Sequence, residues 1–248
     1  MDLGLQGKRA AVAASSAGLG YGVAAALVAD GARVVICGRD AARVDAATAR
    51  LGGGAIGLVA DVGTTAGASG FVEAASEALG GLDILVPNAG GPPPGTFEST
   101  SLEAYLPALE LNLLSVVAMC RAAVPAMRAQ RWGRIVAITS LFVRQPSPTL
   151  ILSNTARAGA TAFLKTLARE VARDGVTVNS VQPGTHATDR MRSLHGGDLS
   201  QAAAGVPAGV VGDAADFGAV VAFLCSEQAR FVTGVHLPVD GGAYAGLL

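Results

Sequence analysis

Short apolar runs rich in β-branched residues alternate with longer segments rich in alanine and leucine along the whole chain. Most of the short runs are continuously apolar, which is typical of strands buried on both faces of a parallel sheet. The apolar runs predict seven strands, at Arg9–Ala14, Arg33–Gly38, Ala55–Ala60, Asp83–Val86, Arg134–Thr139, Thr177–Val181 and Val235–Val239. The longer segments predict helices at Leu19–Asp30, Ala41–Leu51, Ala66–Leu79, Leu102–Gln130, Leu150–Arg173 and Ala214–Ser226.

The regular alternation of strand and helix indicates an α/β fold of the Rossmann type, with a doubly wound, mainly parallel sheet and helices on both faces. No linker, repeat or low-complexity tract interrupts the chain, so we assign residues 1–248 to a single domain. The run Pro92-Pro93-Pro94-Gly95 predicts a rigid loop after the fourth strand. The segment Asp189–Gly212 has the least pattern, and we expect it to form a lid over a substrate.

The composition excludes several classes of protein. Hydrophobic residues make up 51% of the 248 and charged residues 15%, which excludes intrinsic disorder. The formal charge of −1 lacks the basic surplus of a nucleic-acid binder. Cys37, Cys120 and Cys225 lie far apart in apolar runs, which indicates buried thiols in a reducing compartment and predicts no metal site.

The uncharged stretch Ala10–Ala29 is long enough to resemble a signal peptide or a membrane span. Serines and glycines interrupt it where a spanning helix is most hydrophobic, so strand, turn and helix is the better interpretation. We therefore expect a cytoplasmic protein with no membrane or nucleic-acid partner.

A turn with two serines and two glycines joins the first predicted strand to the first helix. A glycine turn lets the backbone approach a pyrophosphate, and the helix that follows offers free N–H groups and the positive end of its dipole. The turn is therefore predicted to bind the phosphates of a dinucleotide. The residues expected to do so are Ser15, Ser16, Gly18, Leu19 and Gly20.

The end of the second strand indicates which dinucleotide is preferred. Selectivity for NAD usually needs a carboxylate there, which accepts a hydrogen bond from the ribose 2′-hydroxyl. Here the strand ends at Gly38 and is followed by Arg39, whose guanidinium suits a 2′-phosphate. We expect NADP(H) to be preferred, with NAD(H) as the alternative.

Further short motifs follow the predicted strands in a fixed order. They are Asp61-Val62 after the third strand, Asn88-Ala89-Gly90 after the fourth, Asn112 in the long helix, Ser140 after the fifth, Pro183-Gly184 after the sixth, and Val239-Asp240-Gly241-Gly242 near the end of the chain. With this set, the chain resembles the short-chain dehydrogenase/reductase family over nearly all of its length. It is most similar to the 3-oxoacyl-[acyl-carrier-protein] reductase-like branch.

The resemblance implies roles for the matching residues. It implies that Asp61 and Val62 meet the adenine, that Asn88, Ala89 and Gly90 lie along the adenosine ribose, and that Pro183, Gly184 and Thr188 line the nicotinamide end. It also implies a homo-oligomer, a dimer or tetramer formed through the two long helices. Ala14 departs from the pattern, because the family has the first glycine of the turn there.

The catalytic positions depart further from the family, which uses Asn, Ser, Tyr and Lys. Asn112 and Ser140 match, but Ser153 and Arg157 stand where the tyrosine and lysine belong. A serine hydroxyl is far less acidic than a phenol, and a guanidinium keeps its protons. In this setting we expect Ser140 to polarise a carbonyl, Arg157 to hold the nicotinamide ribose and Asn112 to order a water. Ser153 or a bound water then supplies the proton.

Three other sources of the proton stay open. They are a water relayed through Ser153 and Ser140, the imidazole of His186, and a phenol from Tyr105 or Tyr244. The leading hypothesis is an NADP(H)-dependent oxidoreductase that slowly reduces a small carbonyl or a 3-oxoacyl thioester. The rival hypotheses are a non-catalytic NADP(H)-binding sensor or partner subunit, and a structural protein that binds no cofactor.

Overall fold

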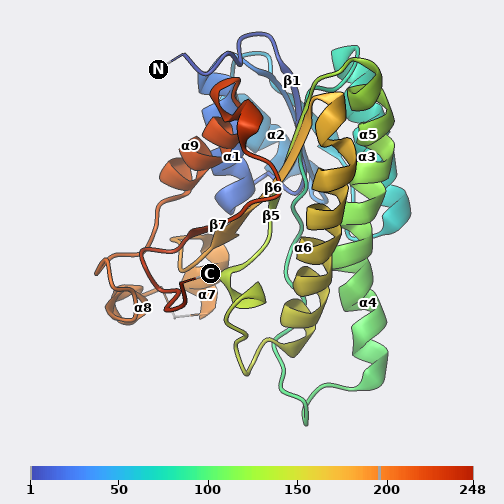
Figure 1. Ribbon diagram of the computed structural model, residues 1–248. Helices are drawn as coiled ribbons and strands as arrows, with labels where there is room; N and C mark the ends of the chain where they lie inside the picture. The colour runs from blue at the N-terminus through green and yellow to red at the C-terminus, as the bar shows by residue number, and fades with distance from the viewer. Residues whose placement is uncertain (1, 195–196, 248) are drawn as a thin grey trace.

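Seven parallel strands form one sheet in the computed structural model, which describes residues 2–194 and 197–247 (Figure 1). The strands are β1 (Arg9–Val12), β2 (Arg33–Gly38), β3 (Ile56–Val59), β4 (Ile84–Val86), β5 (Gly133–Ile138), β6 (Val176–Pro183) and β7 (His236–Val239). Their order across the sheet is β3-β2-β1-β4-β5-β6-β7. Every predicted strand is present, and the predicted doubly wound α/β fold is confirmed.

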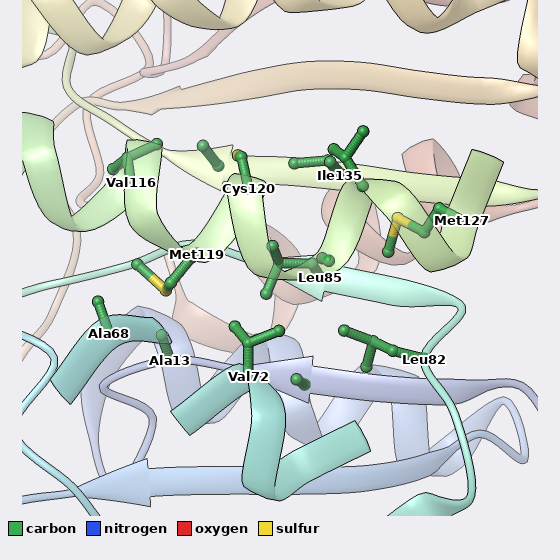
Figure 2. Packing of buried hydrophobic residues seen from close by; sticks show 14 of the residues in the cluster. Ala13, Ala68, Val72, Leu82, Leu85, Val116, Met119, Cys120, Met127 and Ile135 are labelled. Atoms are coloured by element: carbon green, nitrogen blue, oxygen red, sulfur yellow. The ribbon is translucent and has the colours of Figure 1, made fainter. Parts of the chain in front are cut away.

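Helices cover both faces of the sheet. The α-helices of the described residues are α1 (Gly18–Ala29), α2 (Ala41–Leu51), α3 (Thr65–Leu79), α4 (Tyr105–Leu109), α5 (Ser115–Ala129), α6 (Ile151–Val171), α7 (Asp189–Leu194), α8 (Ser200–Ala204) and α9 (Ala214–Cys225), of which α7 and α8 lie in the segment between β6 and α9. One core lies between the sheet and α3, α5 and α6, and Figure 2 shows Val72, Leu85 and Met119 packed within it. A second core lies between the opposite face and α1 and α9.

The helices α1 and α9 cross at unusually close range, because glycines face each other there. A Cβ at Gly22 would clash with the carbonyl of Ala214, and a Cβ at Gly218 would clash with the carbonyl of Gly22. The contact holds α1, the helix that follows the predicted phosphate turn, closely against α9 on the same face of the sheet. Gly22 therefore serves helix packing.

The predicted long helix Leu102–Gln130 is interrupted, which corrects the expectation of one uniform α-helix. A 3₁₀ turn at Leu102–Ala104 leads into α4, and a π-helical turn at Glu110–Leu114 separates α4 from α5. Such turns insert one residue into a helix and are frequent at functional sites. This one contains Asn112.

By length and composition alone, the helical stretch Leu102–Ala129 is apolar enough to cross a membrane. Its buried residues, among them Met119, Cys120 and Met127, pack in the core between the sheet and α3 (Figure 2). The part of this stretch that forms α5 thus contributes to the core against the sheet.

All three cysteines are buried, as predicted. Burial raises the pKa of each thiol, Cys37, Cys120 and Cys225, to about 12. None of them is a nucleophile at neutral pH, because the thiolate is the reactive form.

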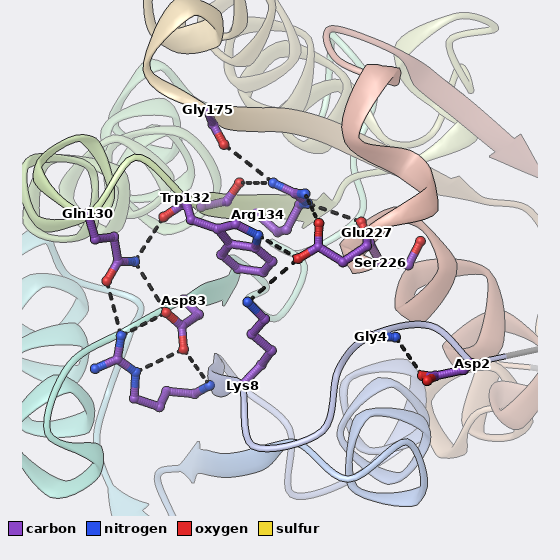
Figure 3. Close-up of polar contacts among 12 residues, drawn as sticks. Asp2, Gly4, Lys8, Asp83, Gln130, Trp132, Arg134, Gly175, Ser226 and Glu227 are labelled. Carbon is purple, nitrogen blue, oxygen red and sulfur yellow. Dashed lines mark hydrogen bonds and ion pairs between the residues drawn. The ribbon is translucent and has the colours of Figure 1, made fainter.

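Polar side chains form hydrogen bonds and ion pairs at the amino-terminal edge of the sheet, opposite the carboxyl ends of the strands (Figure 3). Arg9, at the start of β1, makes a bidentate ion pair with Asp83, with nitrogen–oxygen distances of 2.7 and 2.8 Å. The ring of Trp132 lies under Lys8, whose Nζ is 3.7 Å from the ring centroid, and beside Arg134 at 4.3 Å. Trp132 also donates to Glu227 at 2.9 Å. These contacts stabilise the fold at a distance from the candidate site.

The predicted lid region Asp189–Gly212 contains the short helices α7 and α8, which the sequence pattern did not reveal. Residues 195 and 196, within this region, lie outside the described residues. Its function as a lid stays a prediction.

Candidate cofactor and catalytic site

Most of the predicted site residues follow the carboxyl ends of the strands, on the edge of the sheet where β1 and β4 lie side by side. The chain order reverses there, since β1 pairs with β2 on one side and with β4 on the other. In open α/β sheets this switch point is where ligands bind.

Ala14 gives the turn after β1 an unusual backbone. Its φ is 46°, in the left-handed region that favours glycine. Its amide donates to the Cys37 sulfur at 3.3 Å, and its carbonyl accepts from Asn88 Nδ2 at 3.1 Å. Asn88 also donates to Ala13, so it ties the loop after β4 to the phosphate turn.

Ser15 is fully buried, and its hydroxyl donates to the Val12 carbonyl at 2.6 Å. This hydroxyl therefore holds the turn together, and a direct bond from it to a phosphate stays a prediction. Ser16 is half-buried and lies beside Gly38 at the end of β2, where a Cβ at Gly38 would come 2.8 Å from its Oγ.

The glycines of the turn and the start of α1 fit a pyrophosphate. Gly18 has a φ of 60°, and a Cβ at Gly20 would lie 2.8 Å from the Ala14 carbonyl oxygen. The N-cap of α1, Ala17, makes no side-chain capping bond, whereas Asp40 caps α2 and Thr64 caps α3. The first amides of α1 are thus left for an anion.

The adenosine half of the predicted site has a carboxylate and an arginine at its rim. Arg39 follows β2 and is exposed, as the predicted contact with a 2′-phosphate requires. Asp61 is exposed after β3 and accepts from the amide of Gly63 at 2.9 Å, while Val62 is buried. Ala89 and Gly90 follow Asn88 at the end of β4.

The predicted nicotinamide end comes close to the phosphate turn. Pro183 is the last residue of β6, and Gly184 packs so closely on Asp240 that a Cβ there would lie 2.7 Å from the Asp240 Cβ. The side chain of Thr188 lies beside Gly18. The structure therefore brings the loop after β6 over the turn after β1.

Asn112 is positioned by the π-helical turn. It is 3% exposed, and its Nδ2 donates to the Gly90 carbonyl at 2.8 Å. Its Oδ1 is buried and has no hydrogen-bond partner among the described residues. A buried acceptor of this kind is normally satisfied by water, which suits the predicted ordering of a water.

Ser140 and Ser153 lie at the ends of two neighbouring elements. Ser140 follows β5, where its Oγ accepts from the amide of Phe142 at 3.2 Å. Ser153 lies in the first turn of α6 and is half-buried. Their predicted catalytic roles stay predictions.

Arg157, one helical turn beyond Ser153, contacts main-chain carbonyls. Its Nη1 donates to Ile138 and Thr139, each at 3.1 Å. Its Nη2 makes longer bonds to Ala89 and Gly90, each at 3.4 Å. The contact with a nicotinamide ribose stays a prediction, and these carbonyl contacts were not foreseen.

The placement of His186 does not support it as the acid. It is 4% exposed, and its ring meets Phe217 edge to face at 5.1 Å. Burial lowers the pKa of His186, so the neutral form is favoured. The Tyr244 ring lies 5.4 Å from the Arg144 guanidinium, and Tyr105 begins α4.

A pocket of about 410 Å³ is lined in part by chain neighbours of two predicted catalytic residues. Leu111 and Leu152, the chain neighbours of Asn112 and Ser153, form part of its wall. The other lining residues are Pro92, Pro93, Pro94, Ser99, Thr100, Ser101, Ala104, Pro107 and Ala108. The run of prolines signalled a rigid loop in the sequence, but not this pocket.

The fold, with a glycine turn at its switch point, is that of a Rossmann-type α/β domain. Residues 13–244 match the family described as Enoyl-(Acyl carrier protein) reductase. The chain is 36% identical to the 3-oxoacyl-[acyl-carrier-protein] reductase FabG of Escherichia coli over 242 residues, 98% of this chain and 99% of that protein. It is 35% identical to the FabG of Haemophilus influenzae over 240 residues, 97% of this chain and 99% of that protein.

A solved structure is similar to this chain over its whole length. L-sorbose reductase from Gluconobacter frateurii, complexed with NADPH and L-sorbose, superposes with a TM-score of 0.93 at 32% identity, and each chain is covered completely. The chain belongs to the short-chain dehydrogenase/reductase family, as its motifs predicted.

Proposed function

We propose that this protein is an NADP(H)-dependent oxidoreductase that reduces a carbonyl group, such as that of a 3-oxoacyl thioester, and does so slowly. The observation that carries the proposal is the phosphate turn at the switch point, with uncapped amides at the start of α1 and Arg39 beyond β2. The FabG relatives are named as 3-oxoacyl-[acyl-carrier-protein] reductases, and the L-sorbose reductase was solved with NADPH.

The hydride comes from the nicotinamide when the cofactor is bound, and the chain has to supply the proton. Ser140 polarises the substrate carbonyl, and Asn112 Oδ1 accepts a hydrogen bond from the water that donates a proton to the product alkoxide, directly or through Ser153. The hydroxide that remains takes up a proton from the solvent. A serine is a poor general acid at neutral pH. General acid–base catalysis typically increases a rate 10²–10⁴-fold, so the loss of the tyrosine acid raises the activation barrier by about 3–5 kcal/mol.

The pocket beside Leu111 and Leu152 supports a substrate with an apolar portion. Its walls are mostly proline, alanine and leucine, and Ser99, Thr100 and Ser101 complete the lining. An acyl chain suits such a lining, because burial of apolar surface drives its binding. We also propose a cytoplasmic homo-oligomer built through α4, α5 and α6.

A second candidate function is a non-catalytic NADP(H)-binding sensor or partner subunit. Ser153 and Arg157 at the family's tyrosine and lysine positions favour it, because a serine hydroxyl is a weak acid and a guanidinium keeps its protons. Under this alternative the cofactor site is intact and the proton path is absent.

The experiment has a binding arm and a turnover arm. NADPH and NADH are titrated into the protein by calorimetry, and the oxidation of NADPH with 3-oxoacyl thioesters is followed by absorbance. We expect NADPH to bind at least tenfold more tightly than NADH and turnover to be slow but above the buffer rate. No binding of either nucleotide would refute both functions, whereas binding without turnover would favour the sensor.

A pair of double variants tests whether the proton donor alone limits the rate. Ser153→Tyr with Arg157→Lys restores the residue types of the family, and Ser153→Phe with Arg157→Lys is the matched control without a phenol hydroxyl. We expect the tyrosine variant to be at least about 100-fold faster than the phenylalanine variant. Equal rates would show that the missing phenol is not what slows the enzyme.

A further inference from the structure

The guanidinium of Arg157 joins two segments that are far apart in sequence. Its Nη1 donates to the carbonyls of Ile138, the last residue of β5, and of Thr139, which precedes Ser140. Its Nη2 donates to the carbonyls of Ala89 and Gly90, in the loop after β4. One side chain thus connects the ends of two neighbouring strands.

The contact at Gly90 reaches a further site residue. The Gly90 carbonyl also accepts from Asn112 Nδ2 at 2.8 Å. A carbonyl oxygen has two lone pairs, so it can accept both bonds. Arg157 and Asn112 therefore hold the same peptide group from α6 and from the π-helical turn.

The chemistry of arginine suits this arrangement better than that of lysine. A guanidinium is a planar fork with five N–H donors and no acceptor, whereas an ammonium is a compact point donor on a flexible stem. The bonds of Arg157 diverge toward two strand ends, which a fork can reach with its two terminal nitrogens. A lysine at this position has one nitrogen with which to serve both sides.

We infer that Arg157 is a positioning residue that clamps the loop after β4 to the end of β5, and so fixes Asn112 and Ser140 before any cofactor binds. The clamp consists of bonds within the chain and does not require the proposed function. Its consequences for NADPH binding and turnover do rest on that function.

The first test is the melting temperature of the protein without added nucleotide, for Arg157→Lys and for Arg169→Lys. Arg169 is an exposed arginine on the same helix and serves as the matched control. We expect Arg157→Lys to lower Tm by at least about 5 °C, because charge-assisted bonds to the carbonyls are lost, and Arg169→Lys to change Tm by less than about 1 °C. An equal Tm for both variants would overturn the clamp.

The second test asks whether a guanidinium itself restores the site, which a loss of packing alone would not allow. Arg157→Ala is titrated with NADPH in methylguanidinium chloride and, as the matched control, in methylammonium chloride at the same concentration. We expect the variant to bind NADPH about tenfold more weakly than the wild type, and methylguanidinium alone to recover most of this loss. Recovery by both cations, or by neither, would contradict a geometric role for the fork.

The two tests separate failure of the clamp from failure of the proposed function. If the wild-type protein bound no nucleotide, the proposed function would fail, and the melting temperatures would still decide on the clamp. If nucleotide bound well to Arg157→Lys and its Tm were unchanged, the clamp would fail and the proposed function would stand.

Discussion

Replacing Ala14 by glycine tests whether the phosphate turn is strained. Ala14 has a φ of 46°, and it stands where the family has a glycine. Both of its main-chain hydrogen bonds, to Cys37 and from Asn88, are independent of the side chain and survive the substitution. The change therefore removes one methyl group and leaves the polar contacts intact.

Two opposing effects determine how much Ala14→Gly changes the free energy of unfolding. A residue with a Cβ in the left-handed region costs about 1–2 kcal/mol relative to its right-handed conformation. Glycine avoids this cost, but it loses more conformational entropy on folding, about 0.5–1 kcal/mol relative to alanine. We expect Ala14→Gly to raise the free energy of unfolding by about 0.5–1 kcal/mol, a Tm increase of about 1–4 °C.

The assay is urea unfolding of the protein without nucleotide, with Ala13→Gly as the control. Ala13 is fully buried and its φ is not in the left-handed region, so its variant should lose about 1–2 kcal/mol. Ala14 is half-buried and packs against the core beside α3 and α5. If Ala14→Gly were as unstable as Ala13→Gly, methyl packing would outweigh strain and the reasoning would be refuted.

Three further predictions concern the rest of the fold. Burial raises the pKa of Asp83, but the hydrogen bonds and charge of Arg9 outweigh it and lower that pKa. The pair therefore contributes stability above pH 4 that is lost as the pH falls through the lowered pKa. We expect Asp83→Asn to lower the free energy of unfolding by about 1–3 kcal/mol at pH 7. The variant should also lose less stability than the wild type on acidification, as measured by urea unfolding between pH 2 and 7. Gly218→Ala should lower the free energy of unfolding by more than about 2 kcal/mol, because the added Cβ would clash with the backbone of α1. Gly70→Ala, on the open face of α3, is the control and should raise it by about 0.5–1 kcal/mol, and thermal melts measure both changes. Gln182 is fully buried, and neither polar atom of its side-chain amide has a hydrogen-bond partner among the described residues. Gln182→Met should therefore raise the free energy of unfolding, measured in urea, by about 1 kcal/mol. A decrease would indicate that a buried water satisfies the amide.

The strand layout was predictable because each strand is a continuous apolar run. Parallel strands buried on both faces are apolar at nearly every position, so the run itself marks where the strand lies. The first strand, for example, was expected at Arg9–Ala14 and occurs at Arg9–Val12. The two residues that differ form the turn, where the backbone leaves the sheet while the side chains stay apolar.

The interruption of the long helix was not predictable from hydrophobic periodicity. A π-helical turn adds a single residue, and the apolar pattern on either side of Glu110–Leu114 stays helical. The short helices α7 and α8 have too few residues to show a period. In both cases the structure depends on tertiary contacts that a local pattern does not contain.

The cofactor half of the site and the catalytic half differ in how far the sequence determines them. The predicted phosphate turn consists of glycines, a strand end and the amides of α1, so the motif and its position after β1 were sufficient to predict where the turn lies. Its binding of a dinucleotide stays a prediction. Arg157 was interpreted from the family position alone, and its contacts with Ile138 and Gly90 depend on the reach of a guanidinium across two strand ends. A lysine in the same place would leave those carbonyls to water or to other donors. If the proposed function and the clamp are both correct, arginine in place of lysine changes the proton path and also the rigidity of the site. A comparison of Ser153 variants is then interpretable only when position 157 is varied with them.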